Sequence, residues 1–161
     1  MGRAAQTGAW GVLHVQRDLL SLGIDSAVMT TDTGIDLLAY DPKSRNSFSI
    51  QVKTSAMTLA QRRPDWKIKR EKLLQADLFA FVLKQDCEGE AWYLKQSDLR
   101  KPLVKLYNNE WALTFYRTNC PKDRLSESQM ACFRGRGGIE RYLIRLRAIG
   151  KSVAAKGSRR G

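Results

Sequence analysis

The sequence predicts an α/β fold in which a mixed central sheet is flanked by helices, and three observations lead to this prediction. Apolar residues recur at helical spacing near both ends of the chain. The segments between them alternate polar with apolar residues or form apolar runs of strand length. At 161 residues and 43% hydrophobic content, the chain can bury one core. The predicted order is helix, strand, strand, strand, helix, strand, followed by a C-terminal β/α extension.

The first half of the chain is predicted to supply two helices and four strands. Helix one covers residues 6–22 and ends before Gly23. Three strands follow at 26–31, 35–40 and 47–54. A second, amphipathic helix is predicted over 68–76, and the continuous apolar run 78–84 is typical of an interior strand.

The second half is predicted to extend this core and to end in a tail. Strands are expected over 91–95 and 111–116, and helices from Ser97 to Leu106, over 127–133 and over 139–149. Residues 151–161 are basic and have Val153 as their one large apolar side chain, so we expect a disordered basic tail there. Residues 1–150 are predicted to form a single domain.

The charge of the chain points to a polyanionic partner. Lysine and arginine number 28 against 16 aspartates and glutamates, which gives a formal net charge of +12 and a pI near 10.0. Cations that neutralise phosphates release condensed counterions and thereby bind nucleic acid without sequence preference. A generically basic protein without such a partner is the alternative interpretation.

The cysteines and the N-terminus indicate a cytoplasmic protein. Cys87, Cys120 and Cys132 are far apart and His14 is the single histidine, so we expect neither a zinc site nor a disulfide framework. The N-terminal segment has no apolar signal region, and the longest apolar run, 78–83, is far too short to span a bilayer. We therefore expect no membrane association.

Asp36, Gln51 and Lys53 are the candidate catalytic residues. Strand alternation places Gln51 and Lys53 on one face of the third strand, and a hairpin with the second strand would bring Asp36 beside them. Asp36, Gln51 and the Val52 backbone can offer oxygen ligands to Mg²⁺, with Mn²⁺ as a substitute, while Lys53 offers an ammonium group. The alternative is an ordinary sheet whose Gln51 and Lys53 point to solvent.

Asp36, followed by Gln51-Val52-Lys53, resembles the Asp…(Glu/Gln)-x-Lys signature of the PD-(D/E)XK nuclease superfamily, and the predicted element order over residues 6–85 resembles its restriction-endonuclease-like core. The resemblance, to the homing-endonuclease or Holliday-junction-resolvase-like branch with its Gln-x-Lys variant, implies a magnesium-dependent endonuclease that hydrolyses DNA through a metal-activated water. Two departures stand out. Gln51 replaces the usual acid, which predicts weaker magnesium binding. Helix one lacks the glutamate that many relatives carry, and Asp32 is either its substitute or a structural turn residue.

The expected partner is double-stranded or branched DNA, and palindromic or junction substrates would imply a homodimer or higher homo-oligomer. Predicted nucleic-acid-binding residues are Arg62, Arg63, Lys67, Lys69, Arg70, Lys72, Arg134 and Arg136. Trp66, inside the first cluster, is expected to pack inward, with base stacking as the alternative. The Arg134–Gly138 segment either contacts phosphate or connects two helices.

A non-catalytic nucleic-acid-binding module on the same fold is the alternative function, and no motif supports an RNA-binding protein.

Overall fold

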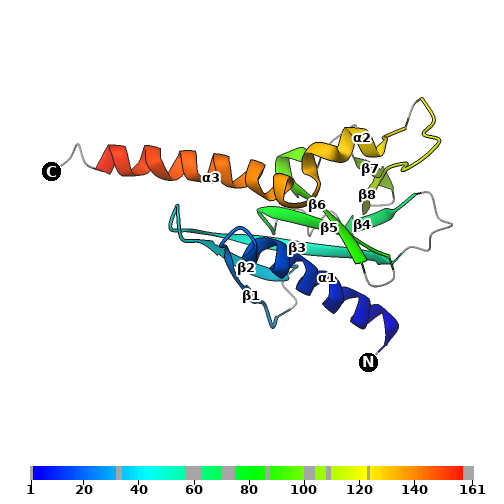
Figure 1. The fold of residues 1–161 in the computed structure, drawn as a ribbon, viewed down its shortest axis with the longest axis horizontal. Coiled ribbons are helices and arrows are strands. Elements are labelled where there is room, and N and C mark those ends of the chain that lie inside the picture. Colours follow the sequence, from blue (N-terminus) through cyan, green and yellow to red (C-terminus); the bar gives the residue numbers. More distant parts are fainter. Residues whose placement is uncertain are drawn as a thin grey trace.

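The computed structural model describes residues 2–31, 34–56, 63–69, 75–85, 88–99, 104–107, 110–122 and 124–157 of the chain. A helix and eight strands precede a short helical region and a long C-terminal helix (Figure 1). Their bounds are α1 (Arg3–Leu20), β1 (Asp25–Val28), β2 (Leu37–Asp41), β3 (Asn46–Ala56), β4 (Asp65–Lys69), β5 (Leu78–Gln85), β6 (Glu88–Lys95), η2 (Gln96–Asp98), β7 (Val104–Tyr107), β8 (Glu110–Thr114), α2 (Glu127–Met130), η3 (Ala131–Phe133) and α3 (Gly135–Gly157).

The strands form two sheets. The larger sheet has the order β1-β2-β3-β5-β6, with β3 and β5 parallel and the other neighbours antiparallel. The smaller sheet has the antiparallel order β4-β8-β7. The predicted α/β fold with a mixed central sheet is confirmed.

The large sheet is buried on both faces at its strand β5, which explains why the sequence of β5 is continuously apolar. Leu78, Ala80 and Val82 pack on one side with residues of α1 and α3. Phe79 and Phe81 pack on the other side with residues of the small sheet and of η3. A strand covered on both faces has no solvent side, so it needs no polar alternation.

Two predicted helices are wrong where the structure describes them. Ile68 and Lys69, expected in a helix over 68–76, belong to β4, while 70–74 lie outside the described residues. The segment Asp-Trp-Lys-Ile-Lys alternates with a period of two, which suits a strand with one buried face. The helix expected from Ser97 to Leu106 is replaced by η2 and by β7, which pairs with β8.

The C-terminal helix α3 is longer than predicted. It takes in Gly135–Gly138, for which the sequence predicts either a phosphate contact or a connection between two helices, and it continues through Gly157. Residues 151–157 are therefore helical rather than the tail that composition predicted, and 158–161 lie outside the described residues. Figure 1 shows this helix extending past the sheet toward the C-terminus. Within the described ranges, no helix has the length and apolarity that a bilayer crossing requires.

An ion pair ties α3 to the last residue of β2. The Asp41 carboxylate is completely buried and accepts two hydrogen bonds from Arg147, from Nε at 2.8 Å and from Nη2 at 3.0 Å. Ser44 and the Lys43 N–H donate to the same carboxylate. The bond to Arg147 is the first of several causes that lower the pKa of Asp41 to about 2.

Candidate active site

Strands β2 and β3 separate at the point where the candidate catalytic residues lie. Their pairing reaches Leu37 opposite Ile50, and one step further Asp36 N–H donates to Ile50 C=O at 2.9 Å. Beyond this step β3 continues along β5 as far as Ala56, which pairs with Lys84. We call the place where the two strands diverge the fork. It begins at Asp36 on the β2 side and at Ile50 on the β3 side.

Asp36 fills the fork with its side chain. Its Oδ2 accepts a hydrogen bond of 2.6 Å from the Val52 N–H, in the place that a backbone carbonyl would take if β2 continued. This bond holds the half-buried carboxylate against β3. Because the N–H and C=O of one strand residue point to the same edge, the Val52 carbonyl also faces the fork.

Gln51 and Lys53 lie on the same face of β3, as strand alternation predicts. They pair in register with Phe79 and Phe81, whose rings belong to the core between the two sheets. Gln51 is 1% exposed, so the alternative in which it points to solvent is wrong for this residue. Lys53 is half-buried. The alternation that places Leu37 on the helical side places Asp36 on the side of Gln51 and Lys53.

The side-chain amide of Gln51 is buried. Its Oε1 makes no hydrogen bond within the described part of the chain. A buried acceptor without a partner costs roughly 1 to 3 kcal/mol, so it is rarely kept without a reason. A cation bound at the fork would satisfy this oxygen.

The donor set at the fork fits a hard divalent ion. Asp36, Gln51 and the Val52 carbonyl supply oxygen and no sulfur or imidazole nitrogen. Among the residues that the structure describes, no cluster of three or more histidines, cysteines or acids could form an all-protein metal cage. Mg²⁺ does not need such a cage, because it commonly keeps several waters and takes one or two carboxylates.

Helix α1 approaches the extension of β3 closely at Gly11. A Cβ atom at this position would lie 1.8 Å from Thr54 Oγ1, so no residue larger than glycine fits without a shift. The helix brings no glutamate to this contact, in agreement with the departure seen in the sequence. Asp32, the proposed substitute, lies outside the described residues.

The predicted basic surface lies partly on the outer face of β4. Lys67 and Lys69 are exposed there, and Lys67 pairs with Glu110 at 3.7 Å. Arg63 is exposed and contacts the Tyr116 hydroxyl at 3.4 Å. Trp66 points the other way and donates its indole N–H to Val82 C=O, so the inward packing predicted for it is confirmed. Arg62, Arg70 and Lys72 lie outside the described residues.

Arg134 and Arg136, the second predicted cluster, differ in their surroundings. Arg134 forms ion pairs with Glu90 at 2.5 Å and with Glu127 at 3.9 Å. Arg136 is exposed, and neither a hydrogen bond nor an ion pair to it occurs among the described residues. The guanidinium of Arg134 is therefore largely occupied by protein carboxylates, whereas that of Arg136 is available.

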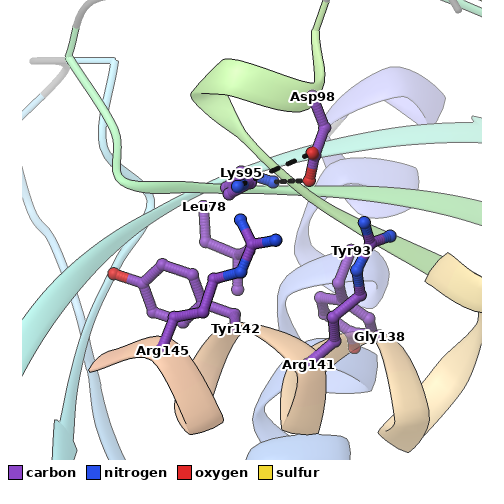
Figure 2. A pocket seen from close by; sticks show the side chains of 8 residues that line it. All are labelled: Leu78, Tyr93, Lys95, Asp98, Gly138, Arg141, Tyr142 and Arg145. Atoms are coloured by element: carbon purple, nitrogen blue, oxygen red, sulfur yellow. Dashed lines mark hydrogen bonds and ion pairs between the residues drawn. The ribbon is translucent and has the colours of Figure 1, made fainter. Parts of the chain in front are cut away.

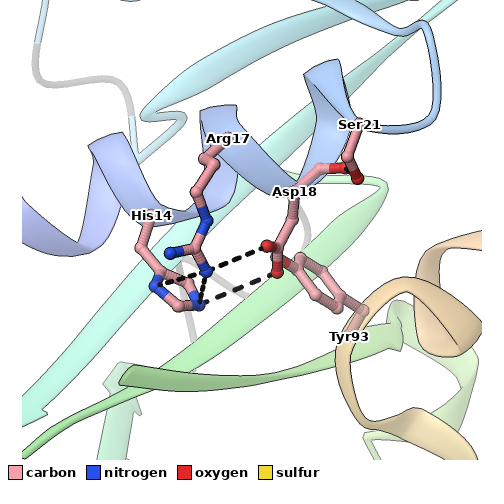
Figure 3. Close-up of polar contacts among 5 residues, drawn as sticks. All are labelled: His14, Arg17, Asp18, Ser21 and Tyr93. Atoms are coloured by element: carbon pink, nitrogen blue, oxygen red, sulfur yellow. Dashed lines mark hydrogen bonds and ion pairs between the residues drawn. The ribbon is translucent and has the colours of Figure 1, made fainter. Parts of the chain in front are cut away.

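Sequence reasoning missed a buried polar cluster between α1 and β6 (Figure 3). The Tyr93 hydroxyl donates to Asp18 at 2.8 Å, and His14 Nε2 lies 3.7 Å from the same carboxylate. Arg17 reaches both Asp18 and the His14 ring at 3.3 Å. Burial lowers the pKa of His14, Asp18 opposes this effect and Arg17 adds to it. Burial, followed by Asp18, raises the pKa of Tyr93. The spacing of four residues between His14 and Asp18 was the available signal.

The chain has the fold of a bacterial homing endonuclease of known structure, which confirms the restriction-endonuclease-like fold that the sequence predicted. No family model and no curated protein matches the sequence. Among solved structures, the chain is similar to the bacterial homing endonuclease I-Ssp6803I, with a TM-score of 0.67, 13% identity and coverage of 94% of this chain and 99% of that one. A second match is Hjc, a Holliday junction resolvase of Archaeoglobus fulgidus, with a TM-score of 0.45, 12% identity and coverage of 66% and 82%.

Proposed function

We propose that this protein is a metal-dependent endonuclease that hydrolyses DNA phosphodiester bonds at the fork. The observation that carries the proposal is the Asp36 carboxylate bonded to Val52 N–H, beside a buried Gln51 whose carbonyl oxygen has no partner among the described residues. A hard cation binds oxygen ligands, and the point where the two strands part offers a carboxylate and an amide oxygen without a partner among the described residues. In a purely structural pair, the polar groups would be hydrogen-bonded to the protein.

Each residue of the fork has a defined part in this proposal. Asp36, Gln51 and the Val52 carbonyl would hold the ion, Mg²⁺ or Mn²⁺, which when bound polarises a phosphoryl oxygen as a Lewis acid. Lys53 places an ammonium beside the scissile phosphate and stabilises the negative charge that develops during attack by water. The hydrogen bond from Val52 N–H keeps the Asp36 carboxylate oriented before substrate arrives.

The test is cleavage of supercoiled plasmid and of synthetic four-way junctions by the purified protein in Mg²⁺ or Mn²⁺. We expect nicking or linearisation by the wild type, and a loss of at least about a hundredfold in Asp36→Asn and in Lys53→Ala. Lys122→Ala removes one exposed cation from the loop before α2, outside the predicted DNA-binding residues, and serves as the matched control. Cleavage that survives both fork substitutions would refute the proposal.

A non-catalytic DNA-binding module is the second candidate function, and the amide at position 51 favours it. Gln51 carries no charge, so the described fork offers an ion a single carboxylate, from Asp36. This alternative predicts salt-sensitive DNA binding that is unchanged by EDTA, with no nicking in either metal. If the protein does cleave both strands of a duplex or junction, we propose a homodimer that presents two forks, which sedimentation with and without DNA would detect.

A further inference from the structure

A cavity that no residue of the fork lines lies between α1, β6 and the start of α3. Its volume is about 280 Å³, close to the lower end of small-molecule sites, which begin at about 300 Å³. His14, Arg17 and Asp18 line it from α1, Glu90 lines it from β6, and Arg134 and Arg136 line it from the region where α3 begins. Three arginines and two carboxylates thus surround one space.

Both carboxylates of this cavity are already engaged by the protein. Asp18 accepts the Tyr93 hydroxyl at 2.8 Å and pairs with Arg17 at 3.3 Å. Glu90 pairs with Arg134 at 2.5 Å and with Arg117 at 3.5 Å. With Arg17, Arg134 and Arg136 against these two carboxylates, the lining keeps one net positive charge.

Two arginines keep N–H donors available to a ligand. Arg136 is exposed, and no partner for it occurs in the described part of the chain. The Arg17 side chain is 69% exposed, and the contacts that it makes to Asp18 and to the His14 ring involve Nη2, which leaves Nη1 and Nε accessible. His14 is buried with a lowered pKa and adds no charge near neutrality. The first turn of α3 also contains no acid.

A different hollow, between α3 and strands β5 and β6, is also basic but is too small to be a phosphate-binding site. Figure 2 shows Arg141 and Arg145 of α3 beside Lys95, which pairs with Asp98 at 3.9 Å. Its volume is about 10 Å³, the space of about one water molecule, so a phosphate cannot enter. Its arginines carry charge but enclose no ligand-sized space.

We propose that the cavity formed by Arg17 and Arg136 binds one phosphodiester group of DNA, apart from the phosphate that is cleaved at the fork. A guanidinium presents a planar pair of N–H donors that matches two phosphate oxygens, and two such groups facing one open space suit a doubly coordinated phosphate. This proposal rests on the proposed function, because DNA held at the fork would bring a backbone phosphate to the cavity. It acts as an anchor that positions the duplex and carries no sequence information.

The experiment measures DNA binding without cleavage, so that it does not depend on activity. A short duplex is titrated with Arg17→Ala, Arg136→Ala and the control Arg145→Ala in EDTA, across a series of salt concentrations, after circular dichroism has confirmed that each variant is folded. We expect the slope of log K against log salt to fall by about one in Arg17→Ala and in Arg136→Ala, and to stay unchanged in Arg145→Ala. A parallel titration with inorganic phosphate tests whether the cavity takes free anions instead.

The outcomes separate this proposal from the nuclease proposal. Equal slopes for the wild type and both cavity variants, or an equal fall in all three variants, would overturn the anchoring site even if the protein cleaves DNA. A fall confined to the cavity variants supports the site even if cleavage is absent. Binding of inorganic phosphate that requires Arg136, with DNA binding unchanged by its removal, would reassign the cavity to a small phosphorylated ligand.

Discussion

Removing Arg147 should destabilise the protein by an amount that depends on pH. The buried Asp41 carboxylate has a pKa of about 2 instead of 3.8, and Arg147 is the first cause of this shift. One pKa unit corresponds to about 1.4 kcal/mol, so the whole shift is worth about 2 kcal/mol. Since Ser44 and the Lys43 N–H remain as partners, Arg147→Ala should lower the free energy of unfolding by about 1 to 2 kcal/mol near neutral pH.

The sign of the pH dependence follows from the lowered pKa. A carboxyl whose pKa is lower in the folded state stabilises fully above its unfolded pKa, and this contribution disappears as the pH falls through the folded value. The difference between wild type and Arg147→Ala should therefore be constant above about pH 5 and shrink between pH 3.8 and about 2. Urea denaturation followed by circular dichroism at several pH values measures it, with exposed Arg145→Ala as the control for lost charge on α3. A difference that is absent at pH 7, or that persists undiminished at pH 2, would refute this reasoning.

Two further predictions concern the fork. Gln51→Glu should lower the Mg²⁺ concentration needed for half-maximal cleavage by about tenfold. Because a buried carboxylate is unfavourable without a counterion, the same variant should have a lower thermal stability in EDTA and recover it in Mg²⁺. An unchanged metal dependence together with an unchanged stability would contradict this prediction. Gly11→Ala places a Cβ 1.8 Å from Thr54 Oγ1 and should lower the free energy of unfolding by about 1 to 3 kcal/mol. The Gly11→Ala/Thr54→Ala double variant should recover part of this loss. Wild-type stability in Gly11→Ala would contradict the prediction and show that α1 can move aside.

The parts of the fold that the sequence predicted are those fixed by local pattern. The apolar run of β5 needs no partner to be recognised as an interior strand, since six consecutive buried residues leave no solvent face. The spacing of Asp36 and Lys53 was informative for a related reason, because strand parity alone sets which face each side chain takes. A hairpin of β2 and β3 was expected to bring Asp36 beside Gln51 and Lys53, but the divergence of the two strands at Asp36 was not predicted.

The errors came from contacts between distant segments. The alternation of Trp66 and Ile68 in β4 is a clear strand pattern, but Ile68 was assigned to an amphipathic helix over 68–76. The strand pairs with β8, whose Leu113 lies opposite Trp66. Arg147 and Asp41 are separated by 106 positions, so no local pattern reveals their pairing. The cavity of Arg17 and Arg136 likewise joins opposite ends of the chain.

The neutral amide at position 51 links metal binding to DNA binding through charge. Before any ligand arrives, the charges of Asp36 and Lys53 cancel, so the three side chains of the proposed site have no net charge. A glutamate at position 51 would leave a net negative site, which attracts a divalent ion but repels the phosphate of the substrate. With glutamine, the phosphate itself must supply the missing negative charge. Because coupling between two ligands is reciprocal, a fork of this composition should take up its metal and its DNA together, each strengthening the binding of the other.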